Sequence, residues 1–163
     1  MNGWSRHNQF RPARLDDADL VIDLVADLNR KVGLIYGIRV DVESSIKTIM
    51  HVIERGVCVV GQESCAGGFI HPYPWNHEAK VGTILFWNYR KPSGIHVFTA
   101  ICEKFKSLGA THVSCSSHFP ENRAVKFYTR FELIPSEIQF IANLTSMKTT
   151  FTPGKEPHHV IAG

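Results

Sequence analysis

The chain has 163 residues, of which 44% are hydrophobic and 20% are charged. This length and composition are typical of one globular domain with a buried core, and they exclude a wholly disordered chain. The formal net charge is only +3. Because Lys and Arg form no cluster or stripe with interleaved aromatic residues, the sequence disfavours nucleic acid as a partner.

The cysteines and the N-terminal residues predict the compartment. The four cysteines form no Cys-x-x-Cys pair; they are Cys58, Cys65, Cys102 and Cys115. We expect them to be buried, reduced thiols, which favours a reducing compartment. The first ten residues lack the apolar run of a signal peptide, and no segment reaches the length of a membrane span. These features predict a cytoplasmic protein without a membrane partner.

The N-terminal third predicts one strand and two helices. The expected elements are a strand over residues 10–14, an amphipathic helix over 17–31, a loop bracketed by Gly33 and Gly37, and a second helix. Asp16 is expected to cap the first helix. Asp41 is expected to open the second helix, and Gly56 to close it.

The remainder of the chain alternates strands and helices. The expected strands are residues 57–62, 66–70, 81–89, 112–116 and 136–144, and the expected helices are residues 95–108 and 122–130. The stretch HPYPWNHE, residues 71–78, predicts a loop. Strand alternation would place Thr83, Leu85, Trp87 and Tyr89 on one face. The order is β-α-α-β-β-β-α-β-α-β, with a domain over 10–144, an extension over 1–9 and a tail over 145–163.

This order and several local motifs resemble the GNAT family of N-acetyltransferases. FRPARLDDADLVIDLV resembles the family's opening strand and helix, and ILFWNYRKPSGIHVFTAICEKF resembles its central strand, acyl-CoA loop and following helix. SLGATHVSCSS and NRAVKFYTRFEL resemble the segments that follow. The Phe-Trp pair is similar to that of GNAT proteins encoded by bacteriophages. The resemblance spans about residues 10–144.

The resemblance implies a fold and an activity. The fold is of the α/β (α+β) class, with a mixed, mostly antiparallel sheet of about six strands flanked by about four helices. The activity is transfer of an acetyl group from acetyl-CoA to a primary amine, by direct attack of the amine on the thioester. The acceptor is then a small molecule or a protein.

The resemblance also implies a binding site for the CoA diphosphate, which needs converging backbone N–H groups at a helix N-terminus. The family loop has a basic or Gln residue followed by two spaced small residues. In this chain Arg90 matches the basic residue and Gly94 the first small one, while His96 stands at the second. Pro92 removes one N–H donor from this loop. The expected CoA contacts come from Trp87, Arg90, Gly94, Ile95, His96, Val97 and Asn122.

Tyr128 matches the family tyrosine that protonates the departing CoA thiolate. A phenol, with an ordinary pKa near 10, is suited to this task. Asn122 matches a residue that often contacts CoA, although an Asn at a helix start is also a plain N-cap. Packing of Tyr128 on the sheet is the alternative to its catalytic role.

The residue that deprotonates the amine is not identified by its sequence pattern. His71, His77 and Glu78 lie near the central strand and are the candidates. The same histidines lack a third ligand, so no metal site is expected. The aromatic residues Tyr73, Trp75 and Trp87 could wall an acceptor pocket or serve as structural anchors.

Two further functions remain open at the level of sequence. The altered loop at residues 90–96 also fits a GNAT fold that has lost turnover and serves as a binding or structural protein, for instance in a phage particle. An acetyltransferase toxin acting on aminoacyl-tRNA would need a more basic surface than a charge of +3 provides. A homo-oligomer or larger assembly could form through the tails.

Overall fold

The computed structural model describes residues 10–36, 39–90, 94–116, 126 and 128–133, with the backbone alone for 31–36. The elements are β1 (Arg11–Pro12), a 3-10 helix (Leu15–Asp17), α1 (Ala18–Tyr36), α2 (Val42–Arg55), β2 (Val57–Gly61), β3 (Ser64–Tyr73), β4 (Asn76–Tyr89), α3 (Gly94–Ser107) and β5 (His112–Cys115). The expected strand at 136–144, the tail, the N-terminal extension and most of the helix expected over 122–130 lie outside the described residues.

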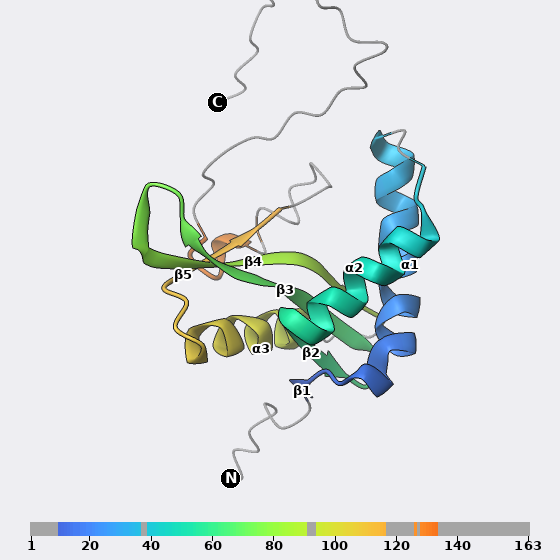
Figure 1. Cartoon of the computed structure of the whole chain (residues 1–163), viewed down its shortest axis with the longest axis horizontal. Coiled ribbons are helices and arrows are strands. Elements are labelled where there is room, and N and C mark those ends of the chain that lie inside the picture. Colours follow the sequence, from blue (N-terminus) through green and yellow to red (C-terminus); the bar gives the residue numbers. More distant parts are fainter. Residues whose placement is uncertain (1–9, 37–38, 91–93, 117–125, 127, 134–163) are drawn as a thin grey trace, which may run out of the picture.

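The five strands form one sheet in sequence order, β1-β2-β3-β4-β5. Neighbouring strands run antiparallel from β1 to β4, while β4 and β5 run parallel. The parallel pair needs a crossover connection, and α3 supplies it. Figure 1 shows α1 and α2 together on one side of the molecule and the β3–β4 hairpin extending away from them.

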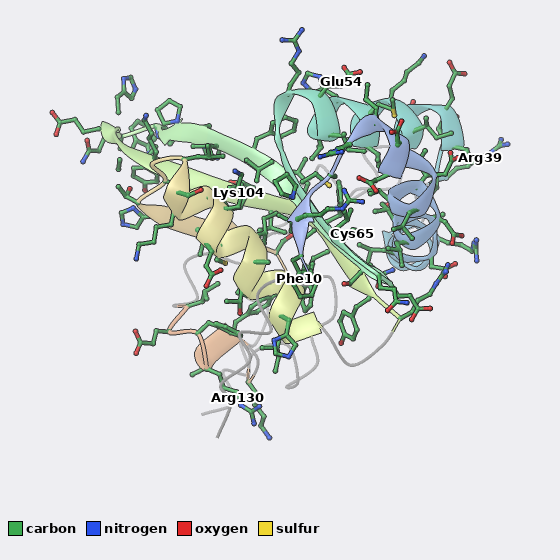
Figure 2. All side chains as sticks on the ribbon, turned by 90° about the horizontal axis from the view of Figure 1, so that it is seen from below. Phe10, Arg39, Glu54, Cys65, Lys104 and Arg130 are labelled. Atoms are coloured by element: carbon green, nitrogen blue, oxygen red, sulfur yellow. The ribbon has the colours of Figure 1, made fainter. Side chains whose placement is uncertain are left out.

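The two faces of the sheet carry separate hydrophobic cores. On one face, side chains of α1 and α2 pack on the sheet around Cys65 and Phe86. On the other face, α3 packs on the sheet through a core that includes Phe98 and Phe105, both almost fully buried. Figure 2 shows Cys65 inside the molecule, whereas Glu54 and Arg39 lie at its periphery. Strand alternation therefore decides which helix layer a side chain meets.

The start of α1 differs from the prediction. Asp17, rather than Asp16, is the acidic residue that stabilises the turn: its carboxylate accepts the Arg14 backbone N–H at 2.8 Å and two Arg11 guanidinium hydrogen bonds at 2.7 Å. Hydrogen bonding to Arg11 holds the pKa of Asp17 below its ordinary value, despite an opposing effect of burial. A short 3-10 helix with Arg14 as its N-cap occupies Leu15–Asp17, so α1 begins at Ala18.

The end of α1 was also predicted wrongly, while α2 is confirmed. Gly33 lies within α1, which continues to Tyr36. One glycine costs a helix about 1 kcal/mol and need not end it. In α2 the Asp41 side chain accepts the Ser44 backbone N–H at 2.8 Å, and Gly56 follows the last helical residue.

Residues 71–78 form a hairpin rather than the predicted loop. β3 continues through Pro72 to Tyr73, and Tyr73 pairs with Asn76 across the turn. β2 pairs with β3 only up to Gly68, so Pro72 lies where β3 has β4 as its described neighbour. A proline is tolerated at such a position because its missing N–H costs no hydrogen bond to a second described strand. The turn between β2 and β3 is likewise tighter than predicted, since Gly61 pairs with Ser64.

A bulge in β4 overturns the predicted alternation of its side chains. Gly68 pairs with Ile84 and Gly67 pairs with Phe86, which leaves Leu85 as an extra residue in β4. Ile84 therefore packs with α3, whereas Phe86 packs with α1 and α2. The four residues predicted to share one face do not, because the bulge reverses the alternation after Ile84.

The predicted fold class is confirmed. Within the described residues the chain is a mixed α+β structure with a five-stranded, mostly antiparallel sheet and three α-helices. Lys126, Tyr128 and Thr129 have helical backbone, in agreement with a further helix in this part of the chain.

Candidate active site

The candidate site lies where β4 continues beyond β5. The last pair of the parallel ladder is Ile84 with Cys115, and β4 runs on for five more residues to Tyr89. Over residues 85–89, β4 pairs with β3 on one side and with no described strand on the other. An edge that faces no described strand is of the kind that can pair with an extended ligand.

Aromatic rings gather on the α3 face of this opening. Trp87 stacks on Tyr89 with a centroid separation of 5.6 Å, and its edge meets Phe98 of α3 at 5.8 Å. Phe98 also contacts Tyr128 at 6.1 Å and Phe131 at 5.0 Å. The bulge matters here because it turns Trp87 toward α3. The result is a rigid apolar wall beside this edge of β4.

Tyr128 lies at the end of β5, where the two strands part. Its hydroxyl donates to the Ser116 backbone carbonyl at 3.4 Å. Burial is the main effect that raises the pKa of Tyr128, to about 12; Cys115 raises it further, while a hydrogen bond from Trp87 opposes the shift. Tyr128 therefore holds its proton at neutral pH and can donate a hydrogen bond.

The predicted diphosphate contacts lie at the start of α3, which begins at Gly94. A Cβ at Gly94 would overlap the Tyr89 ring, so a larger residue here would require that ring to move. Ile95 is exposed and His96 half-buried, whereas Val97 is fully buried. Val97 can therefore offer only its backbone, and His96 is the side chain of this turn that could meet an anion.

Arg90 contacts α1 instead of α3. Its guanidinium Nη2 lies 2.6 Å from the Asp23 carboxylate, and its backbone N–H donates to the Glu63 carbonyl at 3.0 Å. Asp23 raises the pKa of Arg90, chiefly by hydrogen bonding, and the carboxylates of Asp27 and Glu63 act in the same direction. Arg90 thus sits among carboxylates, and Asn122, the other predicted polar contact, lies outside the described residues.

The hairpin residues considered for the acceptor side are not gathered at the site. Trp75, at the tip of the hairpin, is 86% exposed. The position beside it on β4 is Asn76, eleven residues before Trp87, which corresponds to roughly 35 Å along a strand. Tyr73, His77 and Glu78 are exposed on the same hairpin. Only His71 is tied back to the sheet, since its Nε2 lies 2.8 Å from the Thr83 hydroxyl.

Neither a metal-binding cluster nor a membrane-spanning helix occurs among the described residues. No three or more His, Cys, Asp or Glu side chains within the described ranges are grouped so as to hold a metal ion. Among the helices in the described part of the chain, none combines the length and apolar character needed to cross a membrane.

Several residues of the site were missed at the level of sequence. Tyr89, Phe98 and Phe131 complete the aromatic wall, and Cys115 lies at the parting of the strands. The signal for Tyr89 was present, because residues i and i+2 of a strand share a face. Phe131 carried no such signal, since its contact with Phe98 depends on tertiary packing.

Solved structures with a similar fold include acetyltransferases. An acetyltransferase from Trypanosoma brucei superposes with a TM-score of 0.57 at 18% identity, over 83% of this chain and 98% of that one. Glucosamine-6-phosphate N-acetyltransferase from Arabidopsis thaliana superposes with a TM-score of 0.59 at 16% identity, over 83% of this chain and 97% of that one. Ribosomal-protein-alanine N-acetyltransferase from Brucella melitensis biovar Abortus 2308 has a TM-score of 0.59 at 10% identity, over 82% of this chain and 98% of that one.

The likeness to these structures defines the fold of the chain as the GNAT fold. No protein-family model and no curated protein matches the sequence. At 10% to 18% identity the likeness concerns the fold, and activity has to be argued from the site itself. The predicted kinship to phage proteins stays a prediction.

Proposed function

We propose that this chain is an N-acetyltransferase that uses acetyl-CoA and transfers the acetyl group to a primary amine by direct attack. The observation that carries the proposal is the opening between β4 and β5. There a strand edge that faces no described strand leads from the Tyr128 hydroxyl to the first turn of α3. The GNAT fold shared with acetyltransferases supports it.

The residues at the opening fit acetyl-CoA. In the proposal the backbone edge of residues 85–89 pairs with the amide groups of the pantetheine arm, as a strand would. The N–H groups of residues 94–97 bind the diphosphate at the positive end of α3. His96 can add a hydrogen bond, and Asn122 a polar contact, whereas Arg90 holds the end of β4 against α1. Acetyl-CoA supplies the activated acetyl thioester.

Tyr128 is the acid of the proposal. Because its pKa is raised to about 12, its hydroxyl is protonated at every physiological pH. A thiol has an ordinary pKa of 8.5, so a free thiolate would take little of this proton. The phenol therefore acts first as a hydrogen-bond donor that stabilises negative charge on the sulfur as the bond breaks.

The amine must lose a proton, and the α1–α2 face of the sheet offers one partner for it. His71 and Thr83 are hydrogen-bonded on that face, opposite Tyr128. We propose His71 as the first candidate for the base, ahead of the exposed His77 and Glu78. The acceptor, a small molecule or a protein, would approach from this side.

The setting that we propose is a reducing one. The described cysteines are free, and burial raises the pKa of Cys58 and of Cys65 to about 12. Such thiols are unreactive, as expected in a cytoplasm, including a host cytoplasm if the gene is carried by a phage. Assembly through the tails remains part of this proposal.

A second candidate function is binding without turnover. It is favoured by the ion pair of Arg90 with Asp23 and by the Tyr89 ring over Gly94, which together occupy two of the positions predicted to meet phosphate. In that case the GNAT fold would serve as a structural or ligand-binding subunit, for example in a virion.

Calorimetric titration with acetyl-CoA and with CoA separates the two candidates. We expect binding of both, and release of CoA from acetyl-CoA in the presence of a panel of primary amines. Tyr128→Phe should slow this release about 100-fold, the usual contribution of an acid–base group, with an unchanged Kd. Absence of binding at high micromolar acetyl-CoA would sink the transferase proposal, and a weakened Kd in the variant would make Tyr128 a binding residue.

A further inference from the structure

His71 and Thr83 come from adjacent strands and meet on the α1–α2 face of the sheet. Thr83 pairs with Phe69 across the β3–β4 ladder, and Phe69 packs with the core of that face. His71 follows Phe69 by two residues in β3, so its side chain lies on the same face. His71 Nε2 lies 2.8 Å from Thr83 Oγ1. Thr83 is half-buried and His71 is exposed, so a proton that reaches the imidazole can leave to water.

The hydrogen bonds of His71 fix which of its nitrogens carries the hydrogen. Nδ1 lies 3.0 Å from the backbone carbonyl oxygen of Pro72. A carbonyl can only accept, so Nδ1 carries the hydrogen and Nε2 of the neutral ring carries a lone pair. The Thr83 hydroxyl must then donate to Nε2. Both nitrogens are therefore engaged, and a substrate proton can reach Nε2 only by displacing Thr83 or by passing through it.

Thr83 lies close to the point where β4 and β5 part. The last pair of the parallel ladder, Ile84 with Cys115, comes one residue after Thr83. On the other face, the Tyr128 hydroxyl donates to the carbonyl of Ser116, one residue beyond that pair. The two hydroxyls are thus two strand positions apart, roughly 7 Å along the strand direction. This separation fits a thioester whose sulfur meets Tyr128 while the attacking amine meets Thr83.

We propose that Thr83 relays the proton of the acceptor amine to His71, so that the hydroxyl, and not the imidazole, meets the substrate. The inference rests on the proposed function and deepens it. As the amine nitrogen bonds to the acetyl carbon, its proton passes to Thr83 Oγ1 and the hydroxyl proton of Thr83 passes to His71 Nε2. The carbon–sulfur bond breaks, and its electron pair leaves with the CoA sulfur. The imidazolium then releases its extra proton to water.

The relay needs no movement of heavy atoms within the His71–Thr83 pair. The neutral ring accepts at Nε2 and the charged ring donates there, across the same 2.8 Å contact. The Nδ1–H donates to Pro72 in both states. Pro72 is itself fixed in the sheet, where it pairs with Lys80 of β4. The β3–β4 hairpin therefore holds the ring in one orientation throughout the transfer.

The direction of the Thr83–His71 hydrogen bond can be tested in the free protein by long-range proton–nitrogen NMR of the imidazole rings. Above the ordinary pKa of histidine, each neutral ring reveals which nitrogen carries the hydrogen. The chain has nine histidines, and His71→Asn assigns the signals of this one. We expect the Nδ1–H form in the wild type and a shift toward the Nε2–H form in Thr83→Val. A wild-type His71 with hydrogen on Nε2 would overturn the proposal, because that nitrogen could then accept no proton from Thr83.

The relay itself is tested by the rate of CoA release from acetyl-CoA with two nucleophiles. Ethanolamine is mostly charged at neutral pH and must lose a proton before it attacks, whereas hydroxylamine is already uncharged. We expect Thr83→Val to lower the rate about 10- to 100-fold with ethanolamine, at or below the lower end of an acid–base contribution, and less than about 3-fold with hydroxylamine. Thr83→Ser, which keeps a hydroxyl, should recover most of the lost rate. Thr48→Val removes an exposed hydroxyl of α2 and should match the wild type.

The outcomes separate this inference from the proposed function. Equal losses with the two nucleophiles, or a Thr83→Ser variant as slow as Thr83→Val, would overturn the relay while leaving the transferase intact. A wild type that binds no acetyl-CoA in calorimetry would overturn the proposed function, whichever nitrogen of His71 carries the hydrogen. If the wild type binds acetyl-CoA but does not react with ethanolamine, or if Thr83→Val does not fold, the NMR measurement on wild-type His71 decides: the Nδ1–H form supports the relay and the Nε2–H form overturns it.

Discussion

Arg90 illustrates how a single side chain can match a motif and still face another partner. Its guanidinium lies 2.6 Å from Asp23, and Asp27 and Glu63 are close enough to raise its pKa as well. An arginine surrounded by carboxylates presents little net positive charge to a diphosphate. Its neighbour Asn88 also reaches α1, where its side-chain amide donates to the Leu24 carbonyl. The end of β4 is thus attached to α1 by two consecutive polar contacts on that face.

We therefore expect Arg90→Ala to change the acetyl-CoA Kd by less than about 3-fold, since an exposed ion pair contributes little and its cation is already occupied. Calorimetric titration measures this effect. Lys47→Ala is the control, because Lys47 forms an exposed ion pair with Glu43 on α2, remote from the site. A loss of more than 10-fold specific to Arg90→Ala would mean that the guanidinium leaves Asp23 and meets the phosphates.

At the scale of elements, the β4 bulge and the glycine opposite it form one unit. A Cβ at Gly68 would overlap the Thr83 carbonyl oxygen, so the two backbones approach more closely than any side chain permits. The extra residue, Leu85, is accommodated at this point, and it is 47% exposed at the opening. The bulge thus depends on a glycine on the neighbouring strand.

Gly68→Ala should destabilise the fold by about 2 kcal/mol or more, as overpacking against backbone does, and lower the midpoint of urea unfolding. The matched control is Gly109→Asn. Gly109 has a φ of +88° and open space around its Cβ position, and Asn tolerates this conformation. A Gly68→Ala variant as stable as this control would contradict the close approach at the bulge.

Local signals in the sequence predicted some elements well. The cap of α2 was predictable because Asp41 and the backbone N–H that it accepts are three residues apart. The hairpin at 71–78 was not, since Pro72, Pro74 and the polar residues around them are typical of loops. The strand pairing that holds this segment is formed with residues in β4.

The candidate site was predictable only in part for the same reason. The resemblance pointed to Tyr128 and to the start of α3, and the structure brings Tyr128 and Trp87 against the same ring, Phe98. Alternation could not reveal the bulge, because an extra residue changes register without changing composition. The partner of Arg90 is Asp23 of α1, 67 positions earlier in the chain. A local sequence pattern cannot reveal a contact between residues so far apart.

At the scale of the whole molecule, both cores hold protonated thiols. Burial raises the pKa of Cys58 and Cys65 from 9.0 to about 12, and that of Cys102 to about 11. Above pH 9 the unfolded chain loses these protons while the folded chain keeps them. The folded state then binds more protons than the unfolded state, so stability falls as the pH rises.

We expect the urea midpoint to decrease between pH 8.5 and pH 10.5, and the decrease to be shallower in a Cys58→Ala, Cys65→Ala double variant. The comparison of slopes is decisive, because lysine deprotonation contributes equally to both proteins and the double variant lacks two of the thiols. Parallel slopes would show that these thiols are not shielded from water in the folded state.

The strand order of the sheet bears on how the molecule assembles. Strands β2 to β4 are joined by tight turns, and consecutive hairpins of this kind require only short loop closures. β5 is different, because it can add to β4 only after α3 has formed and crossed the sheet. Among the described strands β2 to β5, the parallel ladder that ends at Cys115 is then the last to close. Slow folding phases should therefore concern the opening beside Tyr128, so that ligand-binding ability would appear after most of the helix and sheet signal.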